Sequence, residues 1–175
     1  RLTDVTGVQT CALPIYCDHP YGIPALPRLF IRDADPVSLG VHLPWNQLVG
    51  EGLLEYGYRR EAARLTAHIM SAVIQNLKRS HVFYRTYHAE TGAGQGERNA
   101  LHGLAPIGLF LRALGVEILS TTQVLLRGEN PFPWPVTVKY RGLTVTRQMG
   151  QTEIIFPNGQ PVVLNDPTDA LVTGG

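Results

Sequence analysis

Hydrophobic side chains recur at helical spacing in two adjacent stretches of the chain. After Pro44, which suits the first position of a helix, apolar residues repeat every three to four positions as far as Tyr56. Gly57 then offers a left-handed stop, and a longer stretch with one apolar and one basic or polar side follows at once. The pattern predicts a helix over 44–56 and, after a short turn, an amphipathic helix over 59–79.

A third apolar stretch begins after Asn99, a residue that can cap a helix. Its near-continuous hydrophobicity predicts a helix that ends at Gly115 and is buried on most sides. Between the second and third helices, residues 81–98 combine an aromatic, strand-like run with glycines at 92, 94 and 96. We expect a loop here, and loops on rigid scaffolds often carry function.

The hydrophobic period falls to two after Glu117. Apolar residues alternate between 136 and 145 and recur in short runs further on, with Arg141-Gly142 and Asn158-Gly159 as turns. This pattern predicts a small antiparallel β-module over 119–175, with too few strands to close a stable sandwich alone. Helices followed by strands are not an alternating β-α pattern, so we expect an array of helical hairpins with a β cap.

Composition and charge exclude several classes of protein. The 175 residues are 44% hydrophobic and 17% charged, as in one soluble domain or part of a larger one. The 15 Lys and Arg residues against 14 Asp and Glu leave no basic excess for nucleic acid, and no apolar run approaches the roughly 20 residues of a membrane helix. We expect neither a nucleic acid nor a membrane as a partner, and a cytoplasmic location.

The first fifteen residues differ from the rest. VTGVQTCALPI at 5–15 resembles the in-frame translation of a sequencing-library adapter. The alternative is a loop that ends in a Leu13-Pro14 bend. We expect 1–15 to be an artefact and the remaining chain to be the C-terminal end of a longer reading frame. Cys11 and Cys17 support neither a disulfide framework nor a zinc site.

Two stretches contain residues suited to sugar binding. Trp45 supplies a flat apolar face that can stack on a sugar ring, while His42 and Asn46 can hydrogen-bond hydroxyl groups at the edge of the ring. The alternative is that Trp45 fills the core and His42 is an ordinary loop histidine. The stretch 81–98 adds more polar candidates, with a solvated surface loop as the alternative: Arg85, Tyr87, His88, Glu90, Glu97 and Arg98.

Carboxylates are the credible catalytic groups. The six histidines show no HExxH pattern, so we expect no metal and no cofactor. An inverting glycosidase uses two carboxyl groups about 6.5–9.5 Å apart, one as general acid and one as the base that activates water. Among the glutamates, Glu90 and Glu97 remain as candidates, because those on helix faces near arginines are most simply solvent ion pairs.

Three segments together resemble a known family: YGIP at 21–24, VHLPWNQLVGEGLLEYGYRREAARL at 41–65 and FYRTYHAETGAGQGERNALHGLAPIGLFL at 83–111. They are similar to the last helices of the six-hairpin (α/α) barrel of trehalase-like and mannosylglycerate-hydrolase-like glycoside hydrolases, including glycoside hydrolase family 63. The resemblance implies a mainly α protein with a β appendage: a partial (α/α) barrel over 16–118, then the β-module over 119–175.

The resemblance also implies an inverting glycosidase for a small glycoside or oligosaccharide. In the family, the general base is a Glu directly after an aromatic pair, whereas Arg85 follows Phe83-Tyr84 here. The family's general acid, an Asp, lies upstream of this sequence. Glu97, or else Glu90, is then the candidate base. The residues expected to shape the sugar subsite are His42, Trp45, Asn46, Arg85, Tyr87, His88 and His102, of which His102 falls where the family tends to have Trp.

Two other functions stay open at this stage. A catalytically inactive carbohydrate-binding or structural module would explain why Arg85 replaces the base, and a helical-repeat scaffold would have no pocket at the loops. The expected partners are a small carbohydrate and the missing N-terminal part of the same chain.

Overall fold

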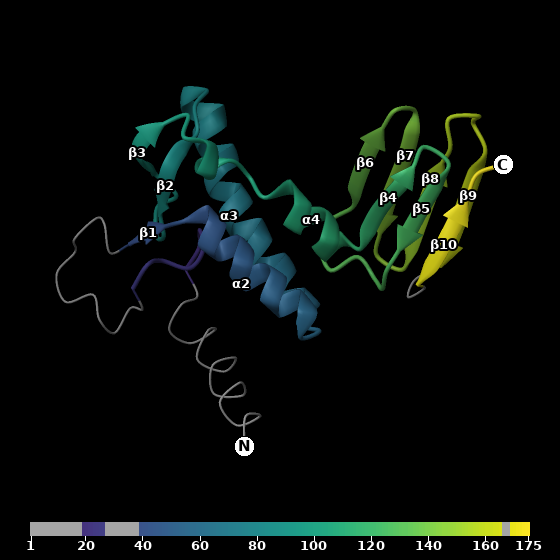
Figure 1. Cartoon of the computed structure of the whole chain (residues 1–175), viewed down its shortest axis with the longest axis horizontal. Helices are drawn as coiled ribbons and strands as arrows, with labels where there is room; N and C mark the ends of the chain where they lie inside the picture. Colours follow the sequence, from purple (N-terminus) through teal and green to yellow (C-terminus); the bar gives the residue numbers. More distant parts are fainter. Residues whose placement is uncertain (1–18, 27–38, 166–168) are drawn as a thin grey trace, which may run out of the picture.

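The computed structural model describes residues 19–26, 39–165 and 169–175, and it places a helix-rich half beside a strand-rich half (Figure 1). The first two helices are α2 (Leu43–Glu55) and α3 (Arg59–Ser80), which confirms both predicted helices. A proline in the first turn of α2 costs no hydrogen bond, since the first N–H groups of a helix have no partner within it. Gly57, with φ of 82°, allows the tight turn between the helices.

The third helix is shorter than its hydrophobic pattern predicted. Residues Leu101–Gly103 form a single 3-10 turn, η2, and the α-helix α4 begins only at Ile107 and ends at Leu114. Asn99 does not cap a helix, because its backbone is left-handed with φ of 56°. Pro106 has no N–H and disfavours a helical residue before it, so the helix cannot run through from η2.

The stretch expected to be a loop is largely a β-hairpin. Strands β2 (Tyr84–His88) and β3 (Gly94–Arg98) pair antiparallel, and β1 (Gly40–Val41) pairs with the other edge of β2. The glycines of β3 make room for the facing strand: a Cβ at Gly94 would collide with the Tyr84 ring. The prediction of a loop is therefore wrong for the residues of β2 and β3.

This small sheet packs on α2 and α3 to form the core of the helix-rich half. The buried residues of that core are Val41, Leu43, Leu65, Ile69, Ala72, Val73, Tyr87 and Ala89.

The strand-rich half is a sandwich of two antiparallel sheets. One sheet contains β4 (Val116–Ser120), β5 (Gln123–Leu126) and β10 (Ala170–Thr173), in the order β10-β5-β4. The other contains β6 (Val136–Tyr140), β7 (Leu143–Gln148), β8 (Gln151–Ile155) and β9 (Pro161–Asn165), in sequence order. The predicted turns at Arg141-Gly142 and Asn158-Gly159 are confirmed.

The two sheets share one hydrophobic core, to which Ala63, Ala113 and Leu114 of the helices also contribute. Whether the strands would be stable without these helices stays a prediction. The buried residues of the two sheets include Val116, Val124, Leu126 and Val172 from one sheet and Val136, Leu143, Val145 and Ile154 from the other.

The expected fold class is also wrong. The described residues form three α-helices and three antiparallel sheets with ten strands, a mixed and strand-rich fold. They are not a mainly α partial six-hairpin barrel with a β appendage. Three features account for the difference: 84–98 pairs as a hairpin, Pro106 shortens the third helix, and α2 and α3 pack against a sheet.

Helix α4 joins the two halves (Figure 1). Its buried Ala113 and Leu114 belong to the core of the sandwich. On its other side, Leu109 packs so closely on α2 that a Cβ at Gly50 would come within 2.5 Å of it. The position of α4 therefore fixes the helix-rich half relative to the sandwich.

Candidate functional site

One end of the β2–β3 hairpin brings together three of the predicted site residues. The pairing register shifts between Tyr84 and Thr86, so that Gly96 and Glu97 together lie opposite Arg85 in a β-bulge. A Cβ at Gly96 would lie 3.4 Å from the Cβ of Arg85, which shows how closely the two strands approach there. Arg85 and Glu97 are therefore neighbours across the hairpin, and both are exposed.

The 3-10 turn η2 holds His102 against the same end of the hairpin. Gly103 lies on the β2 backbone so closely that a Cβ there would collide with the carbonyl oxygen of Tyr84. The Tyr87 hydroxyl donates to the Gly103 carbonyl at 3.0 Å and accepts from the Tyr84 amide at 3.1 Å. His102 is exposed beside this contact, so η2 adds an imidazole to the Arg85 and Glu97 end of the hairpin.

Tyr87 itself lies beneath this cluster rather than on its surface. Its side chain is 0% exposed, and its hydroxyl is engaged by backbone groups. Burial raises the pKa of Tyr87 above its usual value of 10.0, although the hydrogen bond from the Tyr84 backbone opposes this effect. Tyr87 is thus a neutral bridge that fixes η2 on β2.

Glu90 and His88 lie at the opposite end of the hairpin. Glu90 accepts a hydrogen bond from Nδ1 of the buried His19 at 2.8 Å. Nδ1 of His88 accepts from the amides of Glu90 and Thr91 at 3.2 and 3.3 Å and so stabilises the turn. The two candidate bases, Glu90 and Glu97, are therefore separated by the length of β3.

Asn46 is a structural anchor, and it is 2% exposed. Its Oδ1 accepts from the Ile23 amide at 2.8 Å, and its Nδ2 donates to the carbonyls of Ile23 and His42, each at 2.9 Å. The amide thereby ties the segment 19–26 to the start of α2. The His42 side chain is half-buried and forms no cap of that helix.

Trp45 lies in the first turn of α2 and is 67% exposed. The alternative that Trp45 fills the core is therefore wrong, whereas its stacking on a sugar stays a prediction. Helix α2 contacts η2, so Trp45 and His102 belong to elements that touch. Other large apolar side chains of these elements and of the start of α4 are also exposed: Leu48, Leu101, Leu104 and Ile107.

A second feature, which the sequence did not reveal, is a buried arginine at the joint between the two halves. Arg147 is 0% exposed on β7. It donates to the carbonyls of Leu114 and Gly115 at the end of α4, and to those of Arg127 and Gly128 after β5. The sequence did contain one indication of this burial: Arg147 follows Leu143 and Val145 at alternate positions, and such positions face the same side of a strand.

Arg59 supports the same helix end from the start of α3. Its Nε donates to the Ala113 carbonyl at 2.9 Å, and its Nη2 lies 3.5 Å from the Arg112 carbonyl. Positive charge at a helix C-terminus is favourable because the last carbonyls carry partial negative charge. Burial lowers the pKa of Arg59, as does the nearby charge of Arg147, whereas Asp169 raises it.

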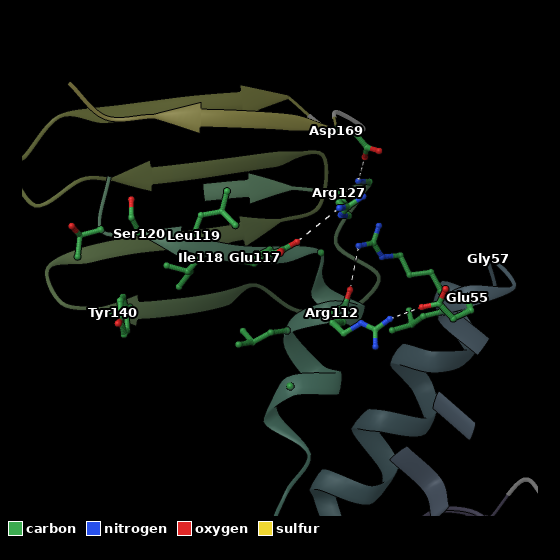
Figure 2. Close-up of a pocket in the computed structure, with 18 of the residues that line it drawn as sticks. Glu55, Gly57, Arg112, Glu117, Ile118, Leu119, Ser120, Arg127, Tyr140 and Asp169 are labelled. Atoms are coloured by element: carbon green, nitrogen blue, oxygen red, sulfur yellow. Dashed lines mark hydrogen bonds and ion pairs between the residues drawn. The ribbon is translucent and has the colours of Figure 1, made fainter. Parts of the chain in front are cut away.

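Beside this joint lies an open groove of about 1490 Å³ (Figure 2). Arg112 points toward Glu55 on one side of it, and Arg127 toward Glu117 on the other. The hairpin residues Arg85, Glu97 and His102 do not line it.

Two kinds of site are not found in the described part of the chain. No group of three His, Cys, Asp or Glu residues there could hold a metal ion. Nor does any of the described helices have the length and apolar character needed to cross a membrane.

Comparison with known proteins gives no relative: no protein-family model, no curated protein and no solved structure matches the chain.

Proposed function

We propose that the chain is the C-terminal part of an inverting glycoside hydrolase that acts on a small glycoside or oligosaccharide. The observation that carries the proposal is the meeting of Arg85, Glu97 and His102 at one end of the β2–β3 hairpin. All three side chains are exposed, and the exposed Trp45 lies on a helix that contacts η2. An aromatic face with convergent hydrogen-bonding groups is the usual composition of a sugar site.

Glu97 is the proposed base that activates water. It is exposed beside Arg85, whereas Glu90 is bonded to His19 at the far end of the hairpin. A general base must lie where water and substrate can reach it, and Glu97 is the more exposed of the two candidates. The general acid must then come from polypeptide outside this sequence, as the resemblance to the family implies.

That additional polypeptide is the proposed partner of the exposed apolar side chains on α2, η2 and α4. Large apolar patches exposed to water are unusual on a monomeric soluble protein and often mark an interface. The side chains concerned are Leu48, Leu101, Leu104 and Ile107.

Sugar binding by the chain can be tested through Trp45. In a Trp134→Phe variant, Trp45 is the only tryptophan. Titration with trehalose and other small glycosides should change its fluorescence saturably, and Arg85→Ala should weaken the change. Arg60→Ala, which removes an exposed arginine at the start of α3, is the control. A flat titration with every sugar would exclude the proposed subsite.

The catalytic role requires the extended protein encoded with the upstream sequence. There, Glu97→Gln should abolish hydrolysis but keep sugar binding, because the amide preserves shape and removes the base. Glu90→Gln is the control at the other end of the hairpin. Normal turnover in Glu97→Gln would remove Glu97 from the mechanism.

A catalytically inactive carbohydrate-binding module is the second candidate. The position of Arg85 favours it, because its exposed guanidinium lies beside Glu97 but forms no ion pair with it in the described residues, and can bind a carboxylate-bearing sugar through two hydrogen bonds. Arg85→Glu distinguishes the two functions. Gain of hydrolysis in the extended protein indicates a lost base, whereas loss of affinity alone indicates recognition by Arg85.

A further inference from the structure

The groove beside the joint collects arginines from four separate elements. Arg59 begins α3, Arg112 belongs to α4, Arg127 follows β5, and Arg141 lies in the turn between β6 and β7. Three carboxylates line the same groove: Glu55, Glu117 and Asp169. The guanidinium groups therefore outnumber the carboxylates, in a chain whose overall charge is only +1.

Two of these arginines form ion pairs with carboxylates of the groove, and the two pairs differ in distance. Arg112 and Glu55 form a close ion pair at 2.7 Å. Arg127 and Glu117 are 3.8 Å apart, which is too long for a hydrogen bond. The Arg127 side chain is also 60% exposed, and it lines the groove.

The Asp169 carboxylate is partly engaged in a hydrogen bond with the backbone. Its Oδ1 accepts from the Gly128 amide at 2.6 Å. No ion pair joins it to Arg59 in the described residues, although its charge favours the ionised guanidinium. Arg59 therefore has carbonyl partners but no carboxylate partner in that part of the chain.

Two glycines hold the Arg59 guanidinium in place. A Cβ at either Gly115 or Gly128 would collide with its Nη atoms, and both glycines have positive φ, at 72° and 52°. With Nε fixed on the Ala113 carbonyl as well, the side chain has little freedom. A guanidinium has five N–H donors, so this rigid group keeps donors beyond the two that the α4 carbonyls accept.

We propose that this groove binds a small phosphate-bearing ligand, with Arg59 and Arg127 as its main contacts. A phosphate dianion offers several acceptor oxygens and a charge that matches two guanidinium groups, of which Arg59 has no carboxylate ion pair in the described residues and Arg127 has only a long one. The rigid Arg59 lowers the ordering cost of binding. The site does not include the hairpin residues, so it stands independently of the proposed glycosidase.

The first test is isothermal titration calorimetry of the whole chain at low ionic strength, where screening is weak. Inorganic phosphate should bind saturably, and glucose should not. Glucose 6-phosphate separates the two sources of the ligand: tighter binding than phosphate identifies a sugar phosphate, and equal binding identifies free phosphate. Absence of saturable binding by both phosphate compounds would overturn the proposal.

The second test uses matched variants. Arg127→Gln should weaken phosphate binding roughly tenfold or more, because a charge-assisted hydrogen bond is lost. Arg98→Gln removes the same charge from the distant β3 and should leave binding unchanged. Unchanged affinity in Arg127→Gln would overturn the proposal, and so would an equal loss in Arg98→Gln, which would indicate a general charge effect. Arg59→Gln should also weaken binding, but it removes support from α4 as well.

Discussion

The helix-rich half and the sandwich both bury polar side chains, but the two halves use them differently. In the helix-rich half, buried amides bind the backbone of loops: Asn46 holds Ile23, and Asn76 binds the Gly92 carbonyl and the Gly94 amide. In the sandwich, the buried Arg147 binds carbonyls at the ends of α4 and β5. The sandwich also has a buried amide of this kind, since Asn130 binds the Trp134 carbonyl and the Phe132 amide. What distinguishes the sandwich is Arg147, a buried charge that fixes one half of the molecule to the other.

This difference separates the roles of the two halves. The loops that the amides and Tyr87 hold carry the exposed candidates Arg85, Glu97 and His102, so their positions depend on short, local hydrogen bonds. The joint depends on several carbonyls that converge on one guanidinium. A buried polar group is costly when it loses its partner, and more costly when the partner is charged. We therefore expect the joint to be more sensitive to mutation than the loops.

The largest loss of stability is expected for Arg147→Met. Methionine fills a similar volume but leaves the carbonyls of Leu114, Arg127 and Gly128 without this donor. The free energy of unfolding, measured by urea denaturation, should fall by about 3 kcal/mol. Arg98→Met, at an exposed position on β3, should change it by less than about 0.5 kcal/mol. An equally small change in Arg147→Met would show that the joint does not depend on this charge.

A smaller and more local effect is expected for Asn46→Ala. Three hydrogen bonds to the backbone are lost, which should cost about 2 kcal/mol. Amide hydrogen exchange at Ile23 should accelerate, while exchange in β7 and β8 stays as in the unmodified chain. Gln47→Ala is the control, because it removes only a bond to Glu51 within the same helix. Equal acceleration in the sandwich would contradict the local role.

The smallest effect concerns Tyr87 and depends on pH. The pKa of Tyr87 is raised in the folded state, so its contribution to the free energy of unfolding is complete below the unfolded value near 10.0. This contribution is lost as the pH rises through the higher folded-state value. Tyr87→Phe should cost about 1 kcal/mol at pH 7, because the Gly103 carbonyl loses its donor. The gap between the two proteins should narrow above pH 10 in urea denaturation. Tyr56→Phe, at an exposed position, is the control for the substitution itself and should change the free energy of unfolding at pH 7 by less than about 0.5 kcal/mol.

The hairpin shows why sequence reasoning was incomplete for the candidate site. The alternate glycines in 92–96 favour a loop by sequence pattern. In the structure, however, Gly94 and Gly96 belong to strand β3, where they make room for the Tyr84 ring and for Arg85. Residue type alone left open whether Trp45 binds a sugar or fills the core, and its exposure excludes only the core position. The buried positions of Asn46 and Tyr87 did not follow from residue type, because both residues can bind either a ligand or the backbone.

The sequence alone determined α2, α3 and the turns of the β-module. These features depend on neighbours three, four or two positions away, whose period is visible in the chain. Only the tertiary structure decided that 84–98 forms a hairpin, that seven strands of the described residues close into a sandwich, and that Arg147 lies inside it. These features depend on contacts between residues far apart in sequence, where the balance of desolvation and hydrogen bonding is set by the partner that the fold supplies.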